Sequence, residues 1–309
     1  MAFTLNPKKS ARRELKRVVR KELRRAREHV RHHQEAAVHE ARKSVKKARA
    51  IVKLLQQIDA DSFEKEARRL GAVGRTLSIL RDADAVIATF DHLRKRFPRR
   101  LPEHTYAIMR RELVRAQARI IRDARADRSL AHAAHTLRAV RRSVKRWRVP
   151  AIHVSDWPDL LSHGYRASRK AMRRAQERPT HAELHRWRKR VKTLWYQMRV
   201  TASLAPGMRG EIRRFKQLQT WLGEHHNLAV LQMTIADGVG LHRMPAEVRE
   251  LAAMSAAVEM ELQRKAFTRG ERLLAEKPKV FARRLRRAFS SSTQRRALPT
   301  RRRPASAVA

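Results

Sequence analysis

Hydrophobic residues recur at intervals of three and four along most of the chain, the spacing that places them on one face of an α-helix. Two segments show the pattern most clearly, with apolar positions at Val38, Ala41, Val45, Ala48, Val52 and Leu55, and at Leu184, Trp187, Val191, Leu194 and Met198. Alternating β-branched segments, which are typical of strands, are scarce. The pattern predicts an all-α protein whose helices bury these faces.

Short segments rich in helix-breaking residues divide the helical stretches. They are Asn6-Pro7, Pro98 to Pro102, Val149 to Pro158, Pro179-Thr180, Pro206-Gly207 and Met244-Pro245. Thr180 and Glu183 have the spacing of a capping box just before Leu184, which predicts that a helix begins there. No breaker marks the boundary between helices near residues 31–34, so its position stays open.

Two parts of the chain repeat each other at an offset of about 146 residues. Placing HEARKSVKKARAIVK (39–53) over HRWRKRVKTLWYQMR (185–199) aligns His39 with His185 and Arg42 with Arg188 without a gap. A second match at nearly the same offset ends in RDADAV and HNLAV, with Asp82 opposite Asn227. We interpret the repeat as an internal duplication, which predicts two similar helical bundles that pack about a pseudo-two-fold axis.

The repeat also sets the expected domain boundaries. A domain over residues 8–289 would consist of one half at 8–149 and a second at 156–289, joined by the proline-containing segment between them. Residues 1–7 would be a lead outside this domain. Residues 290–309 are small, polar and basic, with too little apolar content to pack, which predicts a disordered basic tail.

Each repeated helix carries a second face that consists of polar and mostly cationic residues. In the first helix these are His39, Arg42, Lys43, Lys46, Arg49 and Lys53, and in the second they are His185, Arg188, Lys189, Lys192, Tyr196 and Arg199. Like charges one turn apart repel, and solvated helix faces usually mix both signs. Neither face includes an acidic residue. We therefore expect an external anion to neutralise them.

The composition of the whole chain supports an anionic partner. It has 74 Lys and Arg against 29 Asp and Glu in 309 residues, a formal net charge of +45. Further candidate contacts lie in other cationic rows, which would line a shared groove if the repeated helices face each other: Arg12, Arg13, Lys16, Arg20, Arg138, Arg142, Lys145, Lys170, Arg173 and Arg174.

The histidines that head the two repeated polar faces, His39 and His185, lie among cations. Their imidazoles would resist protonation until a polyanion arrives, so binding is expected to tighten as the pH falls.

Several classes of site receive no support from the sequence. The chain has no cysteine, which excludes disulfides and thiolate metal sites and is compatible with a reducing cytoplasm. No signal peptide and no apolar run near 20 residues occurs, so a soluble protein without membrane insertion is expected. Asp59 with Asp61 and Asp82 with Asp84 are better explained by a helix start or an ion pair than by a metal. We expect His132, His135, His225 and His226 to be solvated or capping residues.

At the paired helices the sequence resembles the CHAD family, the conserved histidine α-helical domain. The resemblance covers roughly Lys8 to Phe289 and rests on both His-x-x-Arg-Lys helices and on the segments RDADAV and LGEHHNLAVL. It implies two pseudo-symmetric helical bundles around a central basic groove or pore, and binding of inorganic polyphosphate, often on polyphosphate granules. Matched by position, the implied phosphate contacts are His39, Arg42, Lys46 and Arg49, then His185, Arg188, Lys189 and Lys192.

Two positions depart from the family pattern. Trp195 stands where the second helix often has a basic residue, and Asn227 stands where an acidic residue is common. With the resemblance we predict a cytoplasmic protein that binds long-chain polyphosphate, at polyphosphate granules. We expect binding without catalysis and without a cofactor, because the sequence shows no carboxylate set for Mg²⁺, no glycine-rich phosphate loop and no nucleophile beside a base.

Nonspecific binding of nucleic acid, above all DNA, is the alternative that the charge supports. A basic tail with Arg295, Arg296, Arg301, Arg302 and Arg303 would suit it. Aromatic residues that could stack on bases make up only 5% of the chain, which favours polyphosphate.

Overall fold

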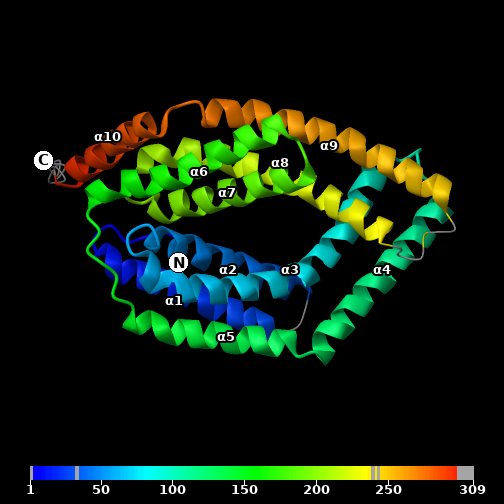
Figure 1. The fold of residues 1–309 in the computed structure, drawn as a ribbon, viewed down its shortest axis with the longest axis horizontal. Coiled ribbons are helices and arrows are strands. Elements are labelled where there is room, and N and C mark those ends of the chain that lie inside the picture. The colour runs from blue at the N-terminus through cyan, green and yellow to red at the C-terminus, as the bar shows by residue number, and fades with distance from the viewer. Residues whose placement is uncertain (1–2, 32–34, 238–240, 242–243, 298–309) are drawn as a thin grey trace, which may run out of the picture.

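The structure is a computed structural model that describes residues 3–31, 35–237, 241 and 244–297. Within these residues the regular secondary structure is helical, with no strand, which confirms the all-α prediction (Figure 1). The α-helices are α1 (Ala11–Arg31), α2 (Glu35–Leu55), α3 (Ala60–Arg96), α4 (Glu103–Ala126), α5 (Ser129–Ser143), α6 (Trp157–Glu177), α7 (His181–Thr201), α8 (Arg209–Ala236), α9 (Pro245–Leu273) and α10 (Pro278–Ala297). Short 3₁₀ turns are η1 (Val144–Arg146), η2 (Val154–Asp156) and η3 (Pro206–Met208).

The helices pack in the same order in each half of the chain. Helix α1 contacts α2 and α5, as α6 contacts α7 and α10, and α2 packs on α3 as α7 packs on α8. The halves meet where α2 contacts α7 and α3 contacts α8 (Figure 1). This order is what two similar halves would give, while the duplication itself stays an inference from the sequence repeat.

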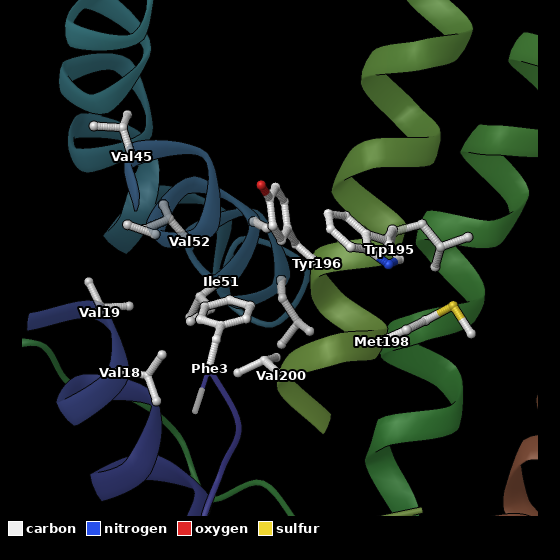
Figure 2. Packing of buried hydrophobic residues seen from close by; sticks show 14 of the residues in the cluster. Phe3, Val18, Val19, Val45, Ile51, Val52, Trp195, Tyr196, Met198 and Val200 are labelled. Atoms are coloured by element: carbon white, nitrogen blue, oxygen red, sulfur yellow. The ribbon is translucent and has the colours of Figure 1, made fainter. Parts of the chain in front are cut away.

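The apolar faces predicted for the repeated helices are buried at every position. Val45 and Val52 of α2 and Trp187 and Val191 of α7 are all fully covered. Figure 2 shows Val45, Ile51 and Val52 on one side and Trp195, Tyr196 and Met198 on the other. Because these faces point into the core, the remaining polar faces of α2 and α7 are left to form a site.

The N-terminal segment is part of this core, so the prediction that residues 1–7 are a lead outside the domain is wrong for the residues described. Phe3 and Leu5 are buried. The Leu5 amide donates to the Val200 carbonyl at 2.9 Å, and the Ser203 hydroxyl donates to the Leu5 carbonyl at 2.6 Å. In Figure 2 Phe3 lies between the first-half helices and Val200 of α7. The segment thereby ties the two halves together.

A second, smaller core holds the far ends of α3 and α8 together with α4 and α9. Phe90, Met109, Leu231 and Met254 are buried in it. Because α3 and α8 are anchored at both cores, the part of α3 that faces α2 and α7 is fixed in position.

The predicted breakers lie between α-helices or, as with Pro158 and Pro245, in the first turn of one. Two other predictions about helix ends differ in detail. Helix α7 begins at His181, and the Thr180 hydroxyl accepts the Glu183 amide at 3.3 Å, but the Glu183 carboxylate pairs with Arg186, so the capping bond is one-sided. Helix α10 continues through Ala297, past the start predicted for a disordered tail at residue 290. Residues 298–309, like residues 32–34 at the open boundary, lie outside the described residues.

Candidate functional site

A cavity of about 300 Å³ lies between α2, α3 and α7. Its lining consists of Arg42, Lys46, Arg49, Ala50, Lys53, Gly71, Gly74, Arg75, Ser78, His185, Arg188, Lys189, Lys192, Thr193 and Tyr196. Eight of these residues are Lys or Arg, and the described lining includes no carboxylate. We call this space the central cavity.

Two buried arginines at equivalent positions of the repeat, Arg42 and Arg188, form its centre. Each is only 7% exposed. Arg42 donates from Nη2 to the Ser78 hydroxyl at 2.6 Å, and the Arg188 Nη2 lies 3.3 Å from the His185 Nδ1. The Nε atoms of both arginines are shielded from solvent and have no hydrogen-bond partner among the described residues. A buried donor without an acceptor is costly, so this pair favours an anion in the cavity.

Two lysines extend the positive charge along the same faces. Burial, followed by the neighbouring charges of Arg188 and Arg42, lowers the pKa of Lys192 to about 7. Burial also holds the pKa of Lys46 well below its usual value, with Lys192 the next cause. The charged forms of both lysines therefore lack compensation until an anion supplies it.

The other end of the cavity is lined by Arg49 and Lys53 of α2 and Arg75 of α3. Burial lowers the pKa of Lys53 to about 8, with Arg49 adding to the effect. Gly74 makes room for Arg49, because a Cβ at Gly74 would lie 3.0 Å from the Arg49 Nη1. The small residues of α3 thus let the long side chains of α2 lie across it.

The Asp82 carboxylate on α3 borders this cluster. It lies 3.8 Å from the Arg42 Nη2 and 3.3 Å from the Arg81 Nη1. Arg81 also donates to the Asn227 side-chain oxygen at 2.8 Å. The neutral Asn227 side chain therefore accepts a hydrogen bond from Arg81, although the family pattern commonly has an acidic residue at position 227.

The two histidines of the repeat differ in the structure. His185 lines the cavity, and its Nδ1 lies 2.9 Å from the His226 Nδ1. Burial, followed by Arg188, lowers the pKa of His185 to about 3, and burial lowers the pKa of His226 as well. His39 is exposed and does not belong to the lining. The expectation that both histidines head equivalent cavity faces therefore holds for His185 only.

Nine of the twelve residues predicted on the two polar faces line the central cavity. The exceptions are His39, Lys43 and Arg199. Lys43 is exposed and pairs with Glu40 at 3.0 Å. The Arg199 guanidinium lies 4.8 Å from the Trp195 ring centre and 5.7 Å from that of Phe3. Trp195 is buried and does not line the cavity. Its ring, which stands where the family pattern often has a basic residue, packs against the Arg199 guanidinium and has no contact with the cavity space.

Several lining residues come from α3, which the sequence reasoning used for the second repeat match and the RDADAV segment but not as a source of contacts to the anion. Gly71, Gly74, Arg75 and Ser78 share one helical face by their spacing, and Arg81 continues it. The sequence feature that could have predicted this part of the lining is a row of small residues with arginines between them. It is weaker than an uninterrupted cationic face.

The further candidate cations do not join the central cavity, and the expectation of a shared groove is wrong for them. Arg13, Lys16, Arg20 and Lys145 line a separate groove at α1, α5 and η1. Another groove, beside α6, is lined by Lys170, Arg173 and Arg174. The remaining three, Arg12, Arg138 and Arg142, are exposed on α1 and α5.

The other histidines and acids have structural surroundings. His132 and His135 are exposed, as expected, but His225 is buried, with its ring centre 5.7 Å from that of His181. The prediction that His225 and His226 are solvated or capping residues is wrong. Asp59 caps α3 by accepting the Ser62 amide at 3.1 Å, and Asp84 accepts from the Gln117 amide at 2.8 Å. No group of three or more His, Asp or Glu in the described part could hold a metal ion.

The all-α fold agrees with comparisons to known proteins. The model of the CHAD domain family matches residues 15–236, well over half of the chain. The chain belongs to the CHAD family. The crystal structure of the CHAD domain from the plant Ricinus communis is similar in fold, with a TM-score of 0.61 over 90% of this chain and 96% of that one, at 15% identity.

No curated protein matches the sequence of this CHAD protein. Among its described residues, no helix is long and apolar enough to cross a membrane.

Proposed function

We propose that the central cavity of this CHAD protein binds long-chain inorganic polyphosphate and leaves it chemically unchanged. The observation that carries the proposal is the pair Arg42 and Arg188, two buried guanidinium groups in a cavity whose described lining has six further Lys or Arg residues and no carboxylate. Phosphate oxygens accept forked hydrogen bonds from guanidinium groups, which makes such a pair a strong phosphate contact.

The arrangement of the cations suits a linear anion. From Arg42 to Lys53 they extend along α2 for roughly 16 Å at the rise of an α-helix. Lys189 and Lys192 accompany them on α7. A linear chain with charge on every unit would meet cations along this whole length, whereas a single small anion would leave most of them unpaired.

Family membership supports the same ligand, since CHAD domains are associated with polyphosphate binding. We extend this association to the present chain, and we propose that binding brings the protein to polyphosphate granules. The described lining offers cations without a carboxylate that would hold a divalent metal for phosphoryl transfer, so we propose binding without turnover.

Nucleic acid is the competing ligand, because a net charge of +45 attracts any polyanion. The enclosed shape of the central cavity favours a thin chain over a duplex. The described lining includes no Phe or Trp, and its Tyr196 is buried, which leaves the half-buried His185 as the one ring on which a base could stack.

The test compares the polyphosphate affinity of variants that lose a cavity arginine with that of variants that lose an exposed cation one or two residues away on the same helix. Arg42→Ala and Arg188→Ala should each weaken binding of labelled long-chain polyphosphate roughly 10- to 100-fold, the loss expected for charge-assisted hydrogen bonds. The controls Lys43→Ala and Arg186→Ala remove exposed cations that already pair with Glu40 and Glu183, and should change the affinity little. Fluorescence anisotropy at physiological salt measures all four.

A competition with duplex DNA at equal phosphate concentration completes the test. Unlabelled polyphosphate should displace the probe far better than DNA, and Arg42→Ala with Arg188→Ala should remove that preference. Equal competition, or equal losses in the cavity and control variants, would mean that the protein binds polyanions through its general charge.

A further inference from the structure

A second basic groove lies on the first half of the molecule, away from the central cavity. It has a volume of about 600 Å³ and is lined by Arg13, Lys16, Arg17, Arg20, Lys21, Arg24, Arg141, Val144 and Lys145. We call it the α1–α5 groove. It shares no lining residue with the central cavity. Helix α1 packs against both α2 and α5, so the two sites use different sides of the first half.

Most of the charge in the α1–α5 groove is uncompensated. Arg17 pairs with Glu14 at 2.7 Å, and Arg24 lies 3.7 Å from Glu28. No carboxylate among the described residues lies within 4.0 Å of the other lining cations Arg13, Lys16, Arg20, Arg141 and Lys145.

Arg20 shows the same unmet hydrogen bonding as the cavity arginines. Its Nε is shielded from solvent and has no partner among the described residues. Beside it, Lys16 reaches across the groove, where its Nζ donates to the Lys145 carbonyl oxygen at 3.3 Å. The groove therefore has walls from two elements, which the Lys16 side chain bridges.

The spacing of the cations is that of a track along α1. Positions 13, 16, 17, 20, 21 and 24 recur once per turn and extend for roughly 16 Å along the helix axis. Arg141 and Lys145 form the opposite wall. Val144 is the one uncharged residue in the described lining, so no aromatic side chain is present to stack on a base. These features match a thin chain of phosphates better than a nucleic acid.

We propose that the α1–α5 groove is a second, independent site for a linear phosphate polyanion, so that one molecule joins two polyphosphate segments. This inference rests on the proposed function, because it assumes that the same ligand occupies the central cavity. A protein with two such sites would cross-link long chains, whereas one with a single site would only coat them.

The stoichiometry of a short linear polyphosphate, too short to reach both sites, tests the proposal by isothermal titration calorimetry. The full-length protein should bind two equivalents. The triple variant Arg13→Ala, Lys16→Ala and Arg20→Ala should bind one equivalent with the affinity of the central cavity unchanged, which also shows that it is folded. Arg42→Ala combined with Arg188→Ala should lose the other equivalent.

A matched control removes the same charge elsewhere. Arg111, Arg119 and Arg122 are exposed on α4, and their replacement by alanine should leave two equivalents. With long-chain polyphosphate, light scattering should report large assemblies for the full-length protein and for this control, but not for the groove variant.

Each contrary result has a separate meaning. One equivalent in the full-length protein, abolished by the Arg42 and Arg188 changes, would overturn the second site and keep the proposed function. One equivalent that only the groove changes abolish would overturn the proposed function and, with it, the two-site arrangement. Equal losses in the groove and α4 variants, or tighter binding of duplex DNA than of polyphosphate in the groove, would also overturn the proposal.

Discussion

Lys192 is a half-buried residue of the central cavity's lining, and its lowered pKa of about 7 leaves its charge incomplete near neutral pH. The charges that lower this pKa come from Arg188 of its own helix, Arg42 and Lys43 of α2 and Arg81 of α3, and Lys46 lies close as well. The Asp82 carboxylate, which contacts Arg42 and Arg81, is the opposing charge at this cluster. An anion in the cavity would stabilise the protonated form and raise this pKa.

Polyphosphate binding should therefore take up protons. The protonated lysine binds the anion better, so affinity is highest below the pKa of the free protein, about 7 for Lys192 and about 8 for Lys53, and falls as the pH rises through these values. Calorimetry in buffers of different ionisation enthalpy measures the uptake at pH 7 to 8.

Lys192→Arg is the control for this prediction. Arginine stays charged across the range, so the variant should take up fewer protons and show a flatter dependence of affinity on pH. Binding without proton uptake, or an affinity that rises with pH, would contradict the description of the cavity as a cluster of incompletely charged cations.

At the scale of residues, the sequence predicted most of the cavity lining, because cationic side chains that recur at helical spacing mark one face of a helix. Nine of the twelve predicted residues line the cavity. It could not distinguish His39 from His185, because their surroundings come from α3 and α8. The position that faces His185 is His226, and the corresponding position of the repeat is Arg81.

Among the elements, α9 is held close to α7 and α6 at Gly270. A Cβ at this position would lie 2.6 Å from the Trp187 Cζ2 and 2.8 Å from the Met172 Sδ. Trp187 belongs to the buried face of the helix that carries Arg188, so this contact helps to fix α7. The approach is too close for any side chain.

Gly270→Ala should destabilise the protein by about 1 to 3 kcal/mol through overpacking. Gly223→Ala is the matched control, since a Cβ there meets no atom within 4 Å in the interior of α8, and removal of a helical glycine should be neutral or stabilise by about 0.5 to 1 kcal/mol. Urea denaturation measures both. A Gly270→Ala variant as stable as Gly223→Ala would contradict the close packing of α9 on α7.

Helix positions were predictable because apolar periodicity and proline-containing breakers are local signals. The packing of the helices against one another could not be predicted in the same way. The cationic rows of α1 and α6 looked like extensions of one groove, yet they line separate grooves, because α1 and α6 pack on the outer sides of α2 and α7. The buried role of Phe3 and Leu5 escaped prediction because two apolar residues outside any helix carry no periodic signal.

For the molecule as a whole, the net charge of +45 is distributed over at least three basic concavities, of which the central cavity is lined by the buried pair Arg42 and Arg188. The first and second halves both contribute to it, through α2 with α3 and through α7. The two-half architecture is therefore what creates the site, and neither half alone would enclose it.

A crystal structure of the full chain with a short linear polyphosphate tests this account most directly. We predict phosphate density between α2, α3 and α7, with oxygens within hydrogen-bonding distance of the Arg42 and Arg188 guanidinium groups. Density confined to the outer grooves, with the central cavity empty at saturating ligand, would contradict the assignment of the cavity as the polyphosphate site.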